Sequence, residues 1–206
     1  LLLENGADVH AKTEDGNTAL MYAIFQDHLD AVTALLQNCS ERDAYQALMK
    51  TLSYNSLDLN IFKLLLQKCF ITPAQDKTDL NRLLCFAAHT GDMEIVQFLL
   101  QNGADINGKD TINVTALMRA CQSDNSDIVK IFISQGAHVN AQDCVGLTAL
   151  MHATLGGNLD AAKLLLENGA DIHIKSKHDG AAIILATICN NISMVKLLLS
   201  YGAHID

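Results

Sequence analysis

Apolar residues toward the C-terminus fall into pairs of short stretches with a glycine break between them. In residues 143–175 the first stretch follows Thr148, and Gly156-Gly157-Asn158 separates it from a second stretch that opens at Asp160. Apolar side chains of the second stretch recur at i, i+3 and i+4, which is typical of a helix with one buried face. The pattern predicts a pair of helices, followed by a short extended arm that leads into a turn.

The predicted ends of these two helices carry suitable residues. Thr148 is a good N-cap because its hydroxyl can accept a hydrogen bond from an amide of the first turn. Asp160 places a negative charge at the positive end of the second helix, and Gly169 supplies the residue that ends it. Helices this short are marginal alone in water, so they need neighbours to give them a core.

The same arrangement recurs with a period of 33 residues. Thr115-Ala116-Leu117-Met118 lies one period before Thr148-Ala149-Leu150-Met151. One glycine recurs at this spacing, at Gly103, Gly136, Gly169 and Gly202. Self-similarity of this kind is the signature of a repeat array. We interpret residues 1–206 as one repeat domain, with the second half of a truncated repeat at 1–12 and repeats at 13–40, 41–76, 77–109, 110–142, 143–175 and 176–206.

Residues 41–76 form the least regular repeat. Ala47-Leu48-Met49 and the run 59–66 resemble the two helical stretches, but the loop between them is remodelled, and Pro73 stands in the connection to the next repeat. We expect a deleted or disordered hairpin there. Just before this repeat, Cys39-Ser40 replaces the usual Gly-Ala pair, which predicts a changed exit from the preceding helix because glycine normally supplies a positive φ at that point.

These features resemble the ankyrin repeat: the period of 33 residues, a Thr-x-Leu-x-x-Ala first helix, a Leu-Leu-Leu second helix and a closing Gly-Ala-Asp-Ile-Asn. The resemblance covers essentially the whole chain and is weakest in residues 41–76. It implies an all-α, curved solenoid of antiparallel helix pairs with short hairpin-like turns between repeats. The family's Thr-Pro-Leu-His becomes Thr-Ala-Leu-Met at positions 18–21, 115–118 and 148–151, so the preorganisation that proline gives the first helical turn is missing.

The charge balance argues against a nucleic-acid partner. The 14 Lys and Arg residues stand against 23 Asp and Glu, giving a net charge of −9, which is the opposite of the basic surface that neutralises phosphates. The longest purely apolar run, residues 181–189, is far shorter than the roughly 20 residues that a membrane-spanning helix needs. We expect a monomer that binds a protein partner and does not insert into a membrane.

The cysteines and histidines do not form a recognisable metal site. None of the six cysteines stands in a Cys-x-x-Cys pair, so neither a zinc knuckle nor a thioredoxin-like motif is present. His10 and His173 take the position that Asn107 and Asn140 hold in other repeats, and no partner ligand lies at a suitable spacing. We expect no metal and no cofactor. Unpaired thiols favour a reducing intracellular compartment, which we take to be the cytoplasm.

Two Cys-His pairs are conceivable nucleophile sites: Cys144 with His152, and Cys121 with His89 of the neighbouring repeat. Neither pair has an evident third residue to orient the base, nor a glycine turn for an oxyanion. We therefore expect that the chain is not an enzyme.

Asn107 and Asn140 stand in contexts similar to those of the asparagines that an oxygen-dependent hydroxylase modifies in animal ankyrin repeats. The alternative is that each side-chain amide forms hydrogen bonds within its turn. The sequence favours hydrogen bonding and leaves hydroxylation open.

The resemblance places partner binding at the hairpin tips and on the concave face of the first helices. Exposed apolar groups at such sites usually mark an interaction surface. In the C-terminal repeats the candidates are Ile112, Val114, Val145, Leu147, Leu155 and Ile188, with His178 beside them. His89 and Phe25 hold corresponding positions in earlier, more polar repeats, so binding should concentrate toward the C-terminus. Two alternatives remain: flanking segments cover these residues, or the predicted register at the tips is off by one.

We interpret the chain as a non-catalytic protein–protein interaction scaffold that binds through its hairpin tips and the concave first-helix face. One alternative is a recruiting segment of a larger enzyme or secreted effector whose catalytic domain lies outside this chain. A third hypothesis is an architectural spacer or membrane-protein adaptor without a discrete binding hot spot. The chain opens inside the second half of a repeat, which favours a fragment of a longer array.

Overall fold

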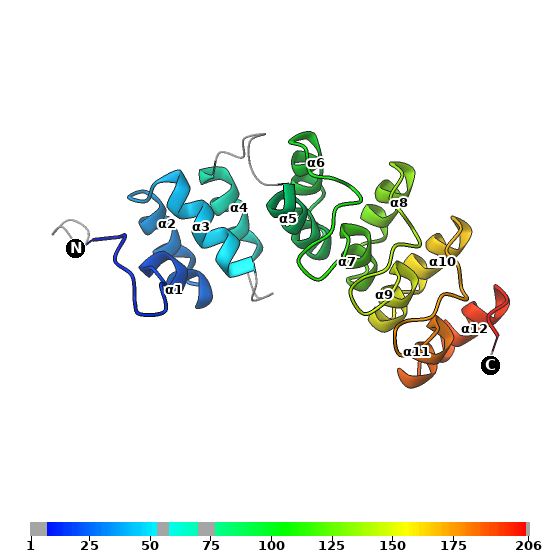
Figure 1. Ribbon diagram of the computed structural model, residues 1–206. Helices are drawn as coiled ribbons and strands as arrows, with labels where there is room; N and C mark the ends of the chain where they lie inside the picture. The colour runs from blue at the N-terminus through cyan, green and yellow to red at the C-terminus, as the bar shows by residue number, and fades with distance from the viewer. Residues whose placement is uncertain (1–7, 53–57, 70–76, 205–206) are drawn as a thin grey trace. The chain divides into compact units, whose positions relative to one another are not determined.

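The computed structural model of the protein describes residues 8–52, 58–69 and 77–204 (Figure 1). These residues form helices joined by turns and loops, and strand-like pairing among them is limited to two isolated bridges, Lys12 with Thr18 and Lys109 with Thr115. The predicted all-α repeat fold is therefore confirmed. None of the helices in these ranges is both long enough and apolar enough to cross a membrane. The chain divides into an N-terminal unit, Leu1–Ala74, and a C-terminal unit, Gln75–Asp206.

The N-terminal unit is built from helix pairs. Helix α1 packs against α2 and helix α3 against α4, while α1 also packs on α3 and α2 on α4. The core between them contains the fully buried side chains of Leu48 and Phe62. The helices are α1 (Ala19–Phe25), α2 (Leu29–Leu36), α3 (Glu41–Thr51) and α4 (Leu59–Lys68).

The C-terminal unit stacks its helix pairs in two layers (Figure 1). The first helices α5, α7, α9 and α11 pack each on the next, and the second helices α8, α10 and α12 do the same behind them, with α6 packed against α5. The helices are α5 (Lys77–Thr90), α6 (Met93–Gln101), α7 (Ala116–Gln122), α8 (Ser126–Ser134), α9 (Ala149–Gly156), α10 (Leu159–Glu167), α11 (Ala182–Ile188) and α12 (Ile192–Ser200).

Small side chains lie where the first helices of the C-terminal unit meet. One alanine in each helix is completely buried, at Ala87, Ala120, Ala153 and Ala186. These positions are 33 residues apart, so the repeat carries its own contact surface. Because the distance between packed helices depends on the side chains at their contact, an alanine here allows close approach. The low aromatic content of the chain, 5%, agrees with this packing.

The helix ends form largely as the sequence predicts. The hydroxyl of Thr148 accepts a hydrogen bond from the amide of Met151, and Thr18 and Thr115 cap α1 and α7 in the same way. Caps of this type contribute about 1 kcal/mol each. Gly157 follows α9 in a left-handed conformation with φ 75°, and Gly169 follows α10 with φ 86°. The predicted break between the two helices and the predicted end of the second are both confirmed.

The connection between α2 and α3 is much shorter than the equivalent connections of the C-terminal unit. Only residues 37–40 separate these helices, whereas residues 102–115 separate α6 from α7. Gln37 continues in a right-handed helical conformation, and Ser40 and Asp43 then form a capping box that starts α3. The changed helix exit predicted from Cys39-Ser40 is confirmed. The hairpin deletion expected at Pro73 lies outside the described residues.

Helix α5 is longer than the other first helices and begins at Lys77. Thr78, Asp79 and Asn81, which the 33-residue register predicted in a hairpin, lie in this helix instead. The reason is local: Leu80, Leu83 and Leu84 are buried on one side of it, so an apolar helical face continues through these positions.

Candidate partner-binding surface

Each helix pair of the C-terminal unit is joined to the next by a segment that we call a finger, at residues 105–115, 138–148 and 171–181. A polar side chain at the base of each finger fixes its shape. Oδ1 of Asp110 accepts hydrogen bonds from the amides of Ile112 and Val114, both at 2.9 Å. Asp143 holds the amides of Val145 and Leu147 at the same distances, so both tips are held rigidly.

Neighbouring fingers are also hydrogen-bonded to one another. The amide of Cys144 donates to the carbonyl of Ile112 at 3.1 Å, and the amide of Lys177 donates to the carbonyl of Val145 at 3.0 Å. Farther down the fingers, Nζ of Lys109 donates to the carbonyl of Gln142 at 3.2 Å. These bonds join the tips into one continuous row.

The tips expose the aliphatic side chains that the sequence singled out, with one exception. Ile112 is 48% exposed and Val145 is 40% exposed, and His178 is exposed at the equivalent tip. Val114 is only 2% exposed, and Leu147, one period later, is half-buried. The prediction that Val114 lies on the open surface was therefore wrong.

A left-handed residue explains why Val114 and Leu147 turn inward. Asn113, with φ 60°, separates Ile112 from Val114, and Gly146, with φ 82°, separates Val145 from Leu147. Such a residue reverses the local path of the chain, so the side chains on its two sides do not share a face. The carbonyl of Val114 accepts a weak hydrogen bond from Sγ of Cys85 in α5, at 3.5 Å, which keeps the segment against the helices.

A second exposed group lies at the far ends of the first helices. Leu155 is 43% exposed near the end of α9, Ile188 is 74% exposed at the end of α11, and His89 is exposed near the end of α5. Because α9 rises about 1.5 Å per residue, Leu155 lies roughly 10 Å along the helix axis from the finger side of that helix. The predicted stripe is thus two separate groups, one at the tips and one at the helix ends.

Phe25 belongs to the N-terminal unit and lies in α1. Its side chain is half-buried, and its ring meets that of Tyr22 edge-on, with ring centroids 6.3 Å apart. It is therefore engaged in aromatic packing within its own helix.

Two charged contacts that the sequence reasoning missed lie between the tips and the helix ends. Nε2 of His152 lies 3.0 Å from Oδ2 of Asp143, with both side chains nearly buried, and Arg119 makes the equivalent contact with Asp110 at 3.4 Å. Burial lowers the pKa of His152, and the hydrogen bond to Asp143 acts in the opposite direction. The detectable signal was the shared spacing of nine residues from the aspartate at the base of the finger.

The conceivable Cys-His pairs are engaged elsewhere. His152 contacts Asp143, and His89 forms its short contact with the hydroxyl of Ser123. Burial raises the pKa of the Cys121 thiol and raises that of Cys85 to about 12. A thiol of this kind stays protonated and is a weak nucleophile. Within the described ranges no group of three or more His, Cys, Asp or Glu side chains could hold a metal ion.

Asn107 and Asn140 both form hydrogen bonds that tie one repeat to the next. The amide nitrogen of Asn140 donates to the carbonyl of Gly169 at 3.0 Å, and its oxygen accepts the amide of Asp171 at 2.8 Å. Asn107 makes the corresponding bonds to Gly136 and His138. The hydrogen-bonding interpretation of these side chains is confirmed.

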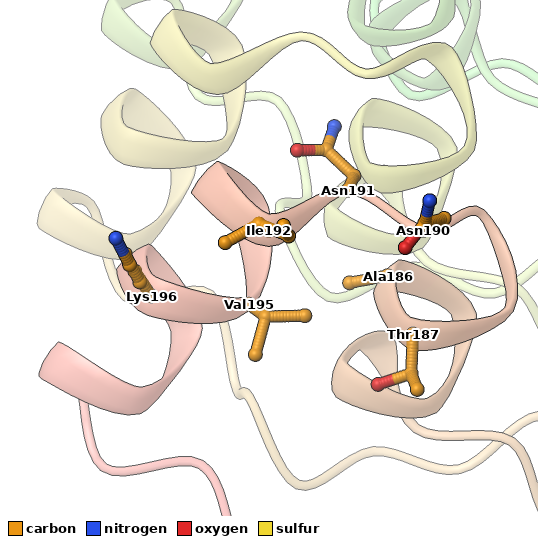
Figure 2. A pocket seen from close by; sticks show the side chains of 7 residues that line it. All are labelled: Ala186, Thr187, Asn190, Asn191, Ile192, Val195 and Lys196. Carbon is orange, nitrogen blue, oxygen red and sulfur yellow. The ribbon is translucent and has the colours of Figure 1, made fainter.

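A groove of about 360 Å³ lies between α11 and α12. Figure 2 shows Thr187 on one side of it and Val195 on the other, with Asn190 and Asn191 at the connecting turn. The equivalent residues of the preceding pair, Thr154 and Ala162, are completely buried.

In earlier pairs this groove receives a side chain from the next one. Asn158, at the start of α10, donates to the carbonyl of Cys121 in α7 at 2.8 Å, and Asn125 donates to the carbonyl of Ala88 in α5 at 2.9 Å. The groove is thus the face on which one helix pair stacks on another, and the exposure of Ile188 is partly a consequence of that open face.

Paired short helices stacked in two layers, with hydrogen-bonded fingers between them, define a helical repeat protein. The chain belongs to the ankyrin-repeat family. The sequence model of that family, described as Ankyrin repeats (3 copies), matches residues 1–79, 55–143, 84–176 and 117–206. The resemblance identified from the motifs is confirmed, and ankyrin repeats are in general protein–protein interaction modules.

A curated protein is similar to a short part of the chain. Over 43 residues the chain is 54% identical to E3 ubiquitin-protein ligase XBAT33 of Arabidopsis thaliana. That stretch is 21% of this chain and 8% of the ligase. The chain therefore spans only a small fraction of that relative's length.

Proposed function

We propose that the chain is a non-catalytic scaffold that binds a partner protein through the fingers and first-helix face of its C-terminal unit. The observation that carries the proposal is the pair of exposed aliphatic tips, Ile112 and Val145, on fingers that hydrogen bonds hold in place. Exposed apolar side chains mark interaction surfaces. A surface that is already ordered loses little conformational freedom when it binds.

Several further properties belong to the same proposal. All six cysteines are free thiols, which supports a reducing compartment such as the cytoplasm. The net charge of −9 disfavours nucleic acid as the partner. We take the chain to act as a monomer without a cofactor, and light scattering of the purified protein tests the monomer directly.

The experiment compares two variants by affinity capture from an extract of the source organism. I112E/V145E places charges on both finger tips, whereas F98E places one on α6, where Phe98 is also exposed. Proteins captured by the wild type should be lost with I112E/V145E and kept with F98E, while helicity by circular dichroism stays unchanged in both. Equal capture by wild type and I112E/V145E would remove the fingers from the binding surface.

The second candidate function is recruitment on behalf of a larger enzyme. The observation that favours it is the similarity of 43 residues to part of a protein named as an E3 ubiquitin-protein ligase. In that case the fingers would hold the protein on which the enzyme acts. An antibody raised against residues 77–204 decides the question, because the mass of the native protein that it detects shows whether further domains are attached.

A further inference from the structure

Exposed lysines surround the aliphatic finger tips. Lys177 follows directly from the finger-to-finger hydrogen bond, since its amide donates to the carbonyl of Val145 at 3.0 Å. Lys175 is exposed two residues earlier, and Lys109 is exposed in the finger of Ile112. We name Ile112, Val145, Lys109, Lys175 and Lys177 together the finger patch.

The acidic residues of the same fingers contribute little negative charge to this patch. Asp143 is buried and its carboxylate is occupied by two backbone amides and His152. Asp110 accepts two backbone amides and pairs with Arg119. In the third finger Ser176 replaces the aspartate at this position, and Asp179 is the exposed acid there. The finger patch is therefore basic in a chain whose net charge is −9.

The second helices show the opposite character. They expose acidic side chains at Glu94, Asp127, Asp160 and Glu167. Their lysines are partly neutralised within the same helix, since Lys130 pairs with Asp127 at 3.2 Å and Lys163 with Glu167 at 3.9 Å. The C-terminal unit thus separates a basic, aliphatic finger side from an acidic second-helix side.

We infer that the finger patch binds a protein segment that carries acidic and aliphatic side chains together. The inference rests on the proposed function and names the chemistry of its partner. Aliphatic side chains of the segment cover Ile112 and Val145, and its carboxylates meet Lys109, Lys175 and Lys177. Complementary charge at the edge of an apolar contact raises the association rate and rejects partners of the wrong sign. Basic segments, which the rest of this acidic chain would attract, are repelled at this site.

The test uses a random 12-residue peptide library displayed on phage and selected on the full wild-type chain. Enriched peptides are synthesised with a fluorescent label, and their dissociation constants are measured by anisotropy. K175E/K177E reverses two charges of the finger patch, and K130E/K163E makes the same change in net charge on the second helices. We expect peptides rich in Asp, Glu, Leu and Val. Their binding should be about tenfold weaker to K175E/K177E and nearly unchanged with K130E/K163E.

The outcomes separate this inference from the proposed function. If the enriched peptides are neutral or basic but still require Ile112 and Val145, as I112E/V145E would show, the scaffold proposal stands and the inference is overturned. If K175E/K177E binds acidic peptides as tightly as the wild type, the inference also falls. If no enriched peptide depends on the finger tips, both fall. Competition by a 20-base single-stranded DNA at equal affinity would assign the lysines to phosphates and overturn the inference.

Discussion

The side chain of His152 links a finger to the helix behind it. Its Nε2 donates to Oδ2 of Asp143 at 3.0 Å, while Oδ1 of the same carboxylate accepts the amides of Val145 and Leu147. Nδ1 is buried, and it has no hydrogen-bond partner among the described residues. Because burial lowers the pKa of His152, the ring is neutral near pH 7 with its proton on Nε2. Protonation would add a buried donor at Nδ1 that has nothing to bind.

This arrangement predicts that acid weakens the C-terminal unit. The pKa of His152 in the folded chain lies below its ordinary value of 6.5, so the unfolded chain takes up the proton first. The contribution to stability is complete above pH 6.5 and is lost as the pH falls toward the folded-state pKa. Urea unfolding at neutral and at mildly acidic pH measures it.

The H152Q variant is the control for that measurement. It should be less stable than the wild type at neutral pH by about 1–3 kcal/mol, because a buried hydrogen-bonded side chain is replaced. It should also lose less stability than the wild type when the pH is lowered, since the other titrating groups are shared. Identical pH dependence in the two proteins would show that His152 is not the responsible group.

At the scale of elements, the fingers depend on a left-handed residue with close neighbours. Gly146 has φ 82°, and a Cβ there would lie 2.9 Å from the amide nitrogen of Lys177 in the next finger. Gly103, after α6, has φ 94°, but a Cβ there would meet nothing within 4 Å. The two glycines therefore share the backbone strain that a side chain brings but differ in available space.

These two glycines give a matched prediction. G103A should cost about 1–2 kcal/mol from backbone strain alone. G146A should cost more, because the added methyl group also pushes against the backbone of the neighbouring finger. Thermal unfolding of the two variants measures the difference, and G146A should weaken partner binding as well. If G103A proves as destabilising as G146A, the close packing of the fingers is not what fixes their shape.

Much of each element could be predicted from the sequence, because the signals are local. Thr148 and Gly169 are cap residues whose conformational preferences act within one turn, and both act as predicted. The inward turn of Val114 could not be read from hydrophobicity, since it depends on the positive φ of Asn113. The continuation of α5 through Asn81 was missed for a similar reason: the 33-residue register was extended over a segment whose own apolar spacing is helical.

At the scale of the whole molecule, the repeats form a nearly one-dimensional array in which each pair contacts mainly its neighbours. The C-terminal unit contains both helix layers, with α5, α7, α9 and α11 packed in sequence. We therefore predict that a fragment of residues 75–206 unfolds cooperatively by itself and retains partner binding. Circular dichroism with urea, and anisotropy with a selected peptide, check the two parts. A fragment that folds but does not bind would place essential contacts in the N-terminal unit.

Amide hydrogen exchange of the chain, free and bound to its captured partner, tests the central claim most directly because it locates the interface without any substitution. We predict slower exchange on binding in the fingers, at residues 110–114, 143–147 and 176–180. The second helices α8 and α10 should keep their exchange rates. Slower exchange confined to α8 and α10, with the fingers unchanged, would contradict the assignment of the finger side as the binding surface.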